Sequence, residues 1–66
     1  MKHIACVTQL FPDIWSAQVL LPLGEIEETV HNSERNSKLS VFTRYRNVCF
    51  IEQEVFQTII DGGCFE

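Results

Sequence analysis

Apolar and polar residues alternate in the first third of the chain, which predicts two strands. Residues 2–10 present one mostly apolar face at a period of two, which is typical of a strand. Residues 11–13, Phe-Pro-Asp, end it, because proline favours an extended predecessor and aspartate favours turns. Residues 15–23 predict a second strand. It either ends near Pro22 or lies at a sheet edge, since proline has no backbone N–H to donate.

The next two segments differ in how clearly they can be assigned. Residues 24–31 fit a helix at spacings of three and four. They fit a strand as well, with Ile26, Glu28 and Val30 on one face. Residues 31–37 contain no hydrophobic side chain and predict a loop.

A β-hairpin is predicted within residues 38–50. Residues 39–45 alternate between apolar and polar, and residues 48–52 are again rich in strand-forming side chains. The two runs join near Arg46 and Asn47, and asparagine tolerates the positive φ that a tight hairpin turn requires.

The hydrophobic period changes after residue 52. Apolar side chains at 55, 56, 59 and 60 fall on one side of a helix, with polar side chains opposite. Gly62 and Gly63 predict the end of this helix, because glycine adopts the left-handed conformation without strain. The alternative is a strand that runs on to Ile60, because Val, Phe, Thr and Ile also suit strands.

These segments predict a single small α+β domain over residues 1–66. We expect a three- to four-stranded antiparallel sheet with one short C-terminal helix packed on a face, because the connections are short. A chain of 66 residues that is 45% hydrophobic and holds five Phe has few layers in which to bury them. A two-fold homodimer is the commonest assembly that would cover the apolar side chains left exposed, and we expect such a dimer.

Charge is segregated along the chain. The formal net charge is −4, which argues against non-specific binding of nucleic acid or anionic membranes by the whole molecule. Residues 35–46 nevertheless hold four of the five basic side chains and no acidic one. We therefore expect this segment to face a partner.

The basic segment has three interpretations. In a hairpin, Phe42, Arg44 and Arg46 would share one face, where a ring and two guanidinium groups can hold single-stranded nucleic acid. Arg and Tyr are also favoured anchors at protein interfaces. Alternatively, the arginines pair with acids on neighbouring strands and Phe42 packs inside. The candidate partner-binding residues are Arg35, Lys38, Phe42, Arg44, Tyr45 and Arg46.

Metal binding and catalysis have weaker support. A Cys3His zinc site would combine His3 with Cys6, Cys49 and Cys64. However, strand residues three apart, such as His3 and Cys6, point to opposite faces. Cys64 and His31 are a nucleophile and a base, but nothing in the sequence brings them together. We expect no metal, no cofactor and no enzymatic activity.

The cysteine count and the chain start predict a cytoplasmic location. Three cysteines are an odd number with no close pair, which is unlike a disulfide framework. The first residues lack a signal peptide's apolar core. No window approaches the roughly 18 apolar residues that cross a bilayer. We expect reduced thiols and no membrane association.

The functional expectation is a stoichiometric regulator or inhibitor of a protein with an acidic surface. Such a module needs one specific surface and little chain, and mobile genetic elements often encode proteins of this type. The alternative function is binding of single-stranded RNA or DNA through the hairpin at 38–50.

Overall fold

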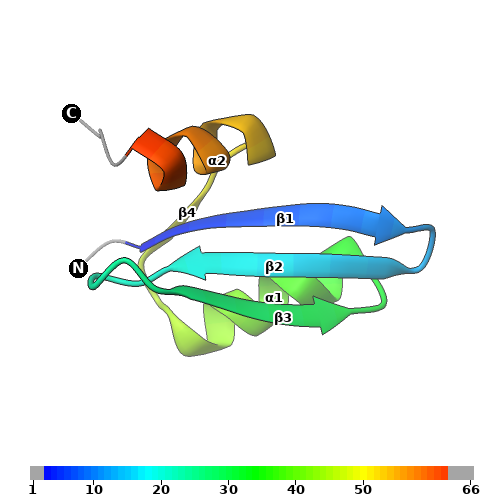
Figure 1. The fold of residues 1–66 in the computed structure, drawn as a ribbon. Helices are drawn as coiled ribbons and strands as arrows, with labels where there is room; N and C mark the ends of the chain where they lie inside the picture. Colours follow the sequence, from blue (N-terminus) through cyan, green and yellow to red (C-terminus); the bar gives the residue numbers. More distant parts are fainter. Residues whose placement is uncertain (1–2, 63–66) are drawn as a thin grey trace.

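A computed structural model describes residues 3–62 as four strands and two helices (Figure 1). In chain order these are β1 (His3–Phe11), β2 (Ile14–Leu20), β3 (Ile26–His31), α1 (Glu34–Arg44), β4 (Val48–Phe50) and α2 (Gln53–Gly62). The sheet order is β3-β2-β1-β4. Neighbours β3-β2 and β2-β1 run antiparallel, whereas β4 runs parallel to β1.

The first three strands form two successive hairpins. The strands predicted at 2–10 and 15–23 are confirmed, with the second ending at Leu20 ahead of Pro22. The ambiguous residues 24–31 form β3, whose Ile26 pairs with Leu20. Gly24 makes this turn at a φ of 91°, a left-handed conformation that glycine adopts without strain.

The loop predicted at 31–37 and the strand predicted at 39–45 are wrong, because most of these residues form α1. Ser33 caps the helix: its hydroxyl oxygen accepts a hydrogen bond from the Asn36 backbone N–H at 3.2 Å. Ser37 and Val41, one turn apart, are fully buried. This contact with the sheet outweighs the preference of β-branched Val41 and Thr43 for a strand.

The predicted hairpin at 38–50 is therefore also wrong, although its second run does contain a strand. Helix α1 carries the chain across the sheet, so β4 arrives beside β1 in the parallel direction, as a parallel neighbour requires. The α+β class is confirmed. The sheet is mixed rather than antiparallel, and there are two helices rather than one.

The C-terminal helix is confirmed as α2, and the alternative of a continued strand is wrong. Its buried side chains are Phe56 and Ile59, which belong to the apolar side that the spacing predicted. The helix reaches Gly62. Gly63 lies outside the described residues.

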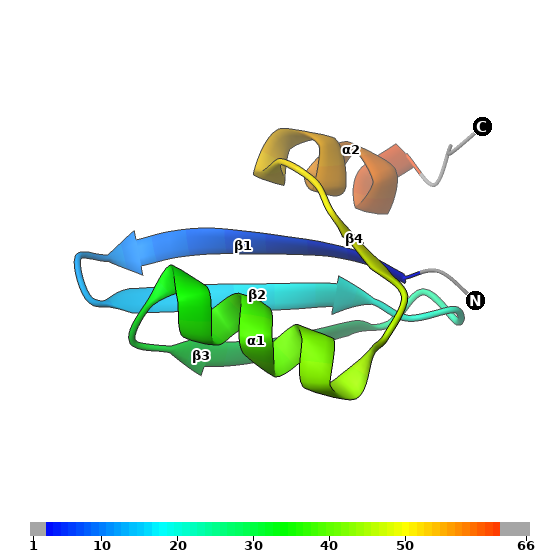
Figure 2. The ribbon, with the colours of Figure 1, turned by 180° about the vertical axis from the view of Figure 1, so that it is seen from behind.

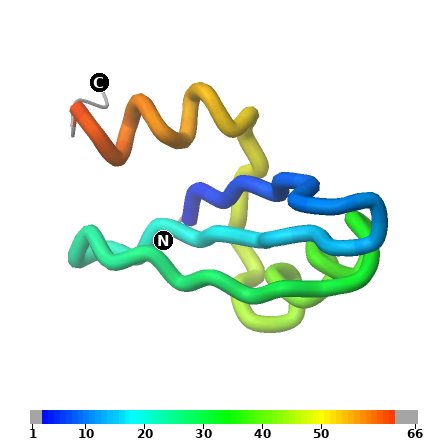
Figure 3. Tube along the Cα trace, turned by 45° about the vertical axis from the view of Figure 1, so that its right-hand side comes forward, coloured from blue at the N-terminus to red at the C-terminus, as the bar shows by residue number. Residues whose placement is uncertain are grey.

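The two helices lie on opposite sides of the sheet. Helix α1 crosses one face (Figure 2), where Val41 packs with Ala5, Ala17 and Val19 to form the main core. Helix α2 lies beyond β1 on the side away from α1 (Figure 3). The described helices are all too short and too polar to cross a bilayer.

Candidate functional site

The outer surface of α1 gathers exposed apolar and basic side chains. Arg35, Leu39 and Phe42 stand at i, i+4 and i+7, so they share one helix face, and Lys38 lies one turn beyond Arg35. Leu39 is 50% exposed and Phe42 47% exposed. We call these four residues the basic–aromatic face. Exposed large apolar side chains beside an arginine also occur at protein interfaces.

Two hollows flank Lys38. One, of about 320 Å³, lies along the helix and is lined by Glu34, Arg35, Lys38, Leu39 and Phe42. The other, of about 360 Å³, lies between the helix and the end of β4. Its lining is Val7, Glu34, Lys38, Phe50, Ile51 and Glu52. The basic–aromatic face is therefore grooved.

Lys38 is only loosely engaged by its own chain. Its ammonium lies 3.6 Å from the Glu34 carboxylate, and both side chains are about half exposed. It also lies 5.8 Å from the centre of the Phe50 ring. An exposed pair of this kind contributes little to stability, so a partner's carboxylate can replace Glu34 at low cost. The Phe50 ring in turn meets Phe42 edge-on, with centroids 5.3 Å apart, which supports Phe42 in its outward position.

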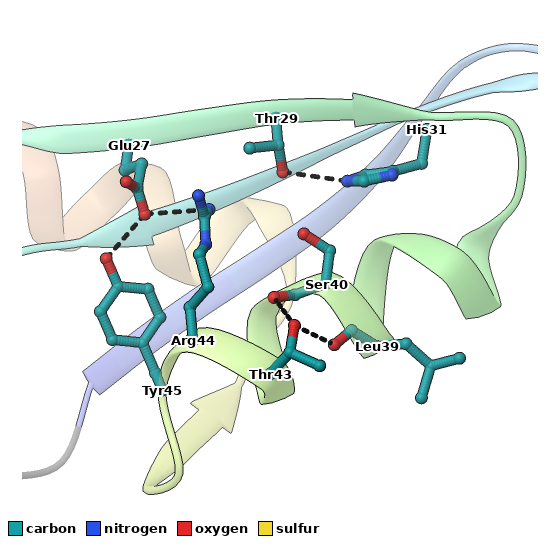
Figure 4. Close-up of polar contacts among 8 residues, drawn as sticks. All are labelled: Glu27, Thr29, His31, Leu39, Ser40, Thr43, Arg44 and Tyr45. Atoms are coloured by element: carbon teal, nitrogen blue, oxygen red, sulfur yellow. Dashed lines mark hydrogen bonds and ion pairs between the residues drawn. The ribbon is translucent and has the colours of Figure 1, made fainter.

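Arg44 and Tyr45 turn the other way, toward β3 (Figure 4). The Arg44 guanidinium lies 2.9 Å from Glu27 Oε1, and the Tyr45 hydroxyl donates a hydrogen bond to the same oxygen at 2.6 Å. The His3 ring lies against the Tyr45 ring at a tilt of 40°, with centroids 4.5 Å apart. The hydrogen bond to the Glu27 carboxylate raises the pKa of Tyr45 above its ordinary value, and burial and the negative charge of Glu27 act in the same direction.

The candidate partner-binding residues thus lie on two different sides of α1. Arg35, Lys38 and Phe42 lie together on the basic–aromatic face, while Arg44 and Tyr45 tie α1 to β3. Arg46 is exposed in the turn that follows the helix. Among residues 3–62, neither Arg35 nor Arg46 has an acidic partner within 4.0 Å.

Sequence reasoning missed Leu39. In a strand, Leu39 would lie on the same face as Val41 and Tyr45. As a helix residue it stands between Arg35 and Phe42. The spacing of four and three was visible in the sequence, but it carries meaning only once the segment is known to be helical.

The other sequence candidates are dispersed. His3 lies against Tyr45, whereas Cys6 is buried on the opposite face of β1, as alternation requires. The His31 ring is within hydrogen-bond distance of the Thr29 hydroxyl, at 3.2 Å. Cys64 lies outside the described residues. In the part of the chain that is described, no three potential metal ligands come together.

No protein-family model matches the chain, and no curated protein or solved structure resembles it significantly.

Proposed function

We propose that the chain is a non-enzymatic binding module that regulates or inhibits a protein partner by docking its basic–aromatic face on an acidic surface. The observation that carries the proposal is the distribution of charge on the fold. Every lysine and arginine of residues 3–62 lies on α1 or in the turn after it, while the acidic side chains lie mainly outside α1.

The chemistry of the face points to an acidic protein surface with an apolar centre. Leu39 and Phe42 supply apolar area for the middle of an interface. Arg35 and Lys38 stand at one end of it and Arg46 follows the helix at the other, where cations steer the approach of an acidic partner. Arg44 is left out of the proposed contact set, because its charge is paired with Glu27. Tyr45 is left out because its hydroxyl is bonded to the same carboxylate.

Binding of single-stranded nucleic acid is the second candidate function, and fewer side chains support it. The open hairpin face that would have stacked bases is a helix, and only Phe42 offers an exposed ring there. Arg35, Lys38 and Arg46 can still contact phosphates as isolated cations. We rank this function below protein binding for that reason.

The test is affinity capture from host lysate with the wild-type chain and with a double variant, Arg35→Glu and Lys38→Glu. Samples are run with and without nuclease. We expect one protein to be retained by the wild type in both samples and lost with the double variant, because like charges now face its acidic surface.

A matched control changes net charge by the same amount elsewhere. The double variant alters charge by −4, since each of two side chains goes from +1 to −1. Four exposed polar side chains changed to acids outside α1 give the same −4, at Gln9, Gln53, Gln57 and Thr58. This control should retain the partner. If both variants lose the partner protein equally, the effect is due to overall charge and not to the basic–aromatic face. If the partner is captured only in samples without nuclease, nucleic-acid binding becomes the preferred function.

A further inference from the structure

The face of the sheet away from α1 is only partly covered. Ala17 and Val19 of β2 pack against α1, so the residues that alternate with them along β2 face the opposite side. Helix α2 lies on that side, where it packs mainly on β1 and stands clear of β2 and β3 in two views (Figures 1 and 3). Among residues 3–62, β2 and β3 therefore have no covering element on this side.

Alternate cross-strand pairs of β2 and β3 form the uncovered surface. We call their six residues the open sheet face: Leu20 with Ile26, Gln18 with Glu28, and Ser16 with Val30. Val30 is 59% exposed, and Leu20 and Ile26 are partly exposed. The open sheet face therefore leaves apolar side chains in contact with solvent.

Glu28 is the single charged residue of the open sheet face. The Ser16 hydroxyl donates a hydrogen bond to Glu28 Oε2 at 2.7 Å, which holds the carboxylate over β2. The lysine and the arginines of residues 3–62 all lie on α1 or in the turn after it, and none is within 4.0 Å of Glu28. The open sheet face thus presents a fixed carboxylate, without a paired cation, among apolar side chains.

This composition is complementary to that of the basic–aromatic face. That face carries Leu39 and Phe42 beside Arg35 and Lys38, so it fits an acidic surface with an apolar centre. The dimensions agree as well. Helix α1 has 11 residues and is about 16 Å long, while the 6 residues of β3 extend about 20 Å. A helix lying over β2 and β3 would stand beside α2 at roughly the 8–10 Å that separates packed helices.

Charge favours contact between unlike faces. Two basic–aromatic faces would bring Arg35 and Lys38 of both copies together, and two open sheet faces would bring together two Glu28 carboxylates. Both of these two-fold arrangements set like charges against each other. One face of each kind instead places cations beside the carboxylate. Such a contact is head to tail and does not close on itself.

We propose that the open sheet face of one copy of the chain binds the basic–aromatic face of a second copy. Helix α1 of the second copy lies over β2 and β3, beside α2, with Leu39 and Phe42 on the apolar side chains and its cations toward Glu28. Each copy offers both faces, so further copies can add in a row. The inference rests on the basic–aromatic face of the proposed function and adds a regulation, because a protein partner must compete with self-association for that face.

The test uses two variants that each disable one face. Leu39→Ala with Phe42→Ala removes the apolar part of the basic–aromatic face, and Glu28→Lys places a cation on the open sheet face. Mass is measured by light scattering from roughly 10 µM to 1 mM. We expect the wild-type mass to rise past that of two copies, because the contact is head to tail. Each variant alone should associate about tenfold or more weakly.

An equal mixture of the two variants gives the sharpest result. The intact α1 of the Glu28→Lys chain can bind the intact open sheet face of the other variant, whereas the remaining faces do not match. We expect association to return and to stop at two copies. A mixture that stays monomeric or grows beyond two copies would overturn the proposal, as would a wild type that stays monomeric or stops at two copies.

Two further variants guard against trivial effects. Asp61→Lys makes the same change of charge as Glu28→Lys, on the side of α2 opposite the buried Ile59, and should associate like the wild type. Val30→Lys places a cation on the open sheet face without removing the Ser16 hydrogen bond. It replaces Glu28→Lys if circular dichroism shows that variant to be unfolded, and wild-type association by Val30→Lys would contradict the proposal.

Capture from lysate separates this inference from the proposed function. The Glu28→Lys chain keeps the basic–aromatic face, so it should retain the protein partner while losing self-association. Self-association by the wild type without a captured partner would refute the proposed function and leave this inference standing. A captured partner with a wild type that stays monomeric would do the reverse.

Discussion

The hydroxyl of Tyr45 donates a hydrogen bond to the Glu27 carboxylate at 2.6 Å and so ties the end of α1 to β3. Arg44 pairs with the same oxygen at 2.9 Å. This arrangement engages the polar groups of two candidate partner-binding residues within the chain, although the Arg44 side chain is 40% exposed. It leaves Arg35, Lys38, Leu39 and Phe42 as the groups that α1 offers outward.

The Tyr45 contact predicts a shifted alkaline titration. The hydrogen bond to the Glu27 carboxylate raises the pKa of Tyr45 above the ordinary value of 10.0. Replacing Glu27 with Gln removes the carboxylate, so the pKa should fall back toward that value. Tyr45 is the single tyrosine of the chain, so tyrosinate absorbance reports it directly. Glu28→Gln is the matched control, because Glu28 faces the other side of β3 and bonds Ser16.

The same shift sets the pH dependence of stability. The fold favours the neutral phenol, so its contribution is fully present below the unfolded pKa, near pH 10.0. It is lost as pH rises through the raised folded value. Wild type and Glu27→Gln should therefore differ less in free energy of unfolding above this range than at neutral pH. Identical tyrosinate titrations in the two proteins would contradict the contact.

Ser33, the N-cap of α1, and Ser37, within the helix, should respond oppositely to replacement by alanine. The Ser37 hydroxyl is buried and has no hydrogen-bond partner among residues 3–62, so Ser37→Ala should raise the free energy of unfolding by about 1 kcal/mol. The Ser33 hydroxyl caps the helix, so Ser33→Ala should lower it by about 1 kcal/mol. Urea unfolding of both variants measures the difference, and a destabilised Ser37→Ala would show that its hydroxyl is bonded.

Adjacent positions on α2 test how the helix is anchored. Phe56 is 1% exposed and Val55 45% exposed. Phe56→Ala should cost about 3–5 kcal/mol, a large part of the stability of so small a domain. Val55→Ala should change stability by no more than about 0.5 kcal/mol. Thermal and urea unfolding compare the two, and similar losses would mean that α2 does not pack through Phe56.

Leu39 separates binding from folding. It is half exposed on the basic–aromatic face, so Leu39→Ala should leave the fold intact. If that face is the interface, affinity for the captured partner should fall about tenfold. Val55→Ala is the control, because Val55 has similar exposure on a different helix. Unchanged affinity after Leu39→Ala would argue against an interface centred on α1.

The sequence by itself determined the elements whose local signals agree. In β1 the alternation and the Pro12–Asp13 turn point to the same strand and end. In α2 the apolar spacing and Gly62 point to the same helix. The basic character of residues 35–46 was equally plain, because charge is read directly from composition.

Tertiary structure decided α1 and everything that depends on it. Residues 39–45 alternate as a strand would, and Val41 and Thr43 favour a strand locally. The helix forms because Ser37 and Val41 bury against the sheet and Ser33 caps its start. Only these long-range contacts show which basic side chains face outward. They also bring β4 beside the first residues of β1, which leaves the rest of that edge open.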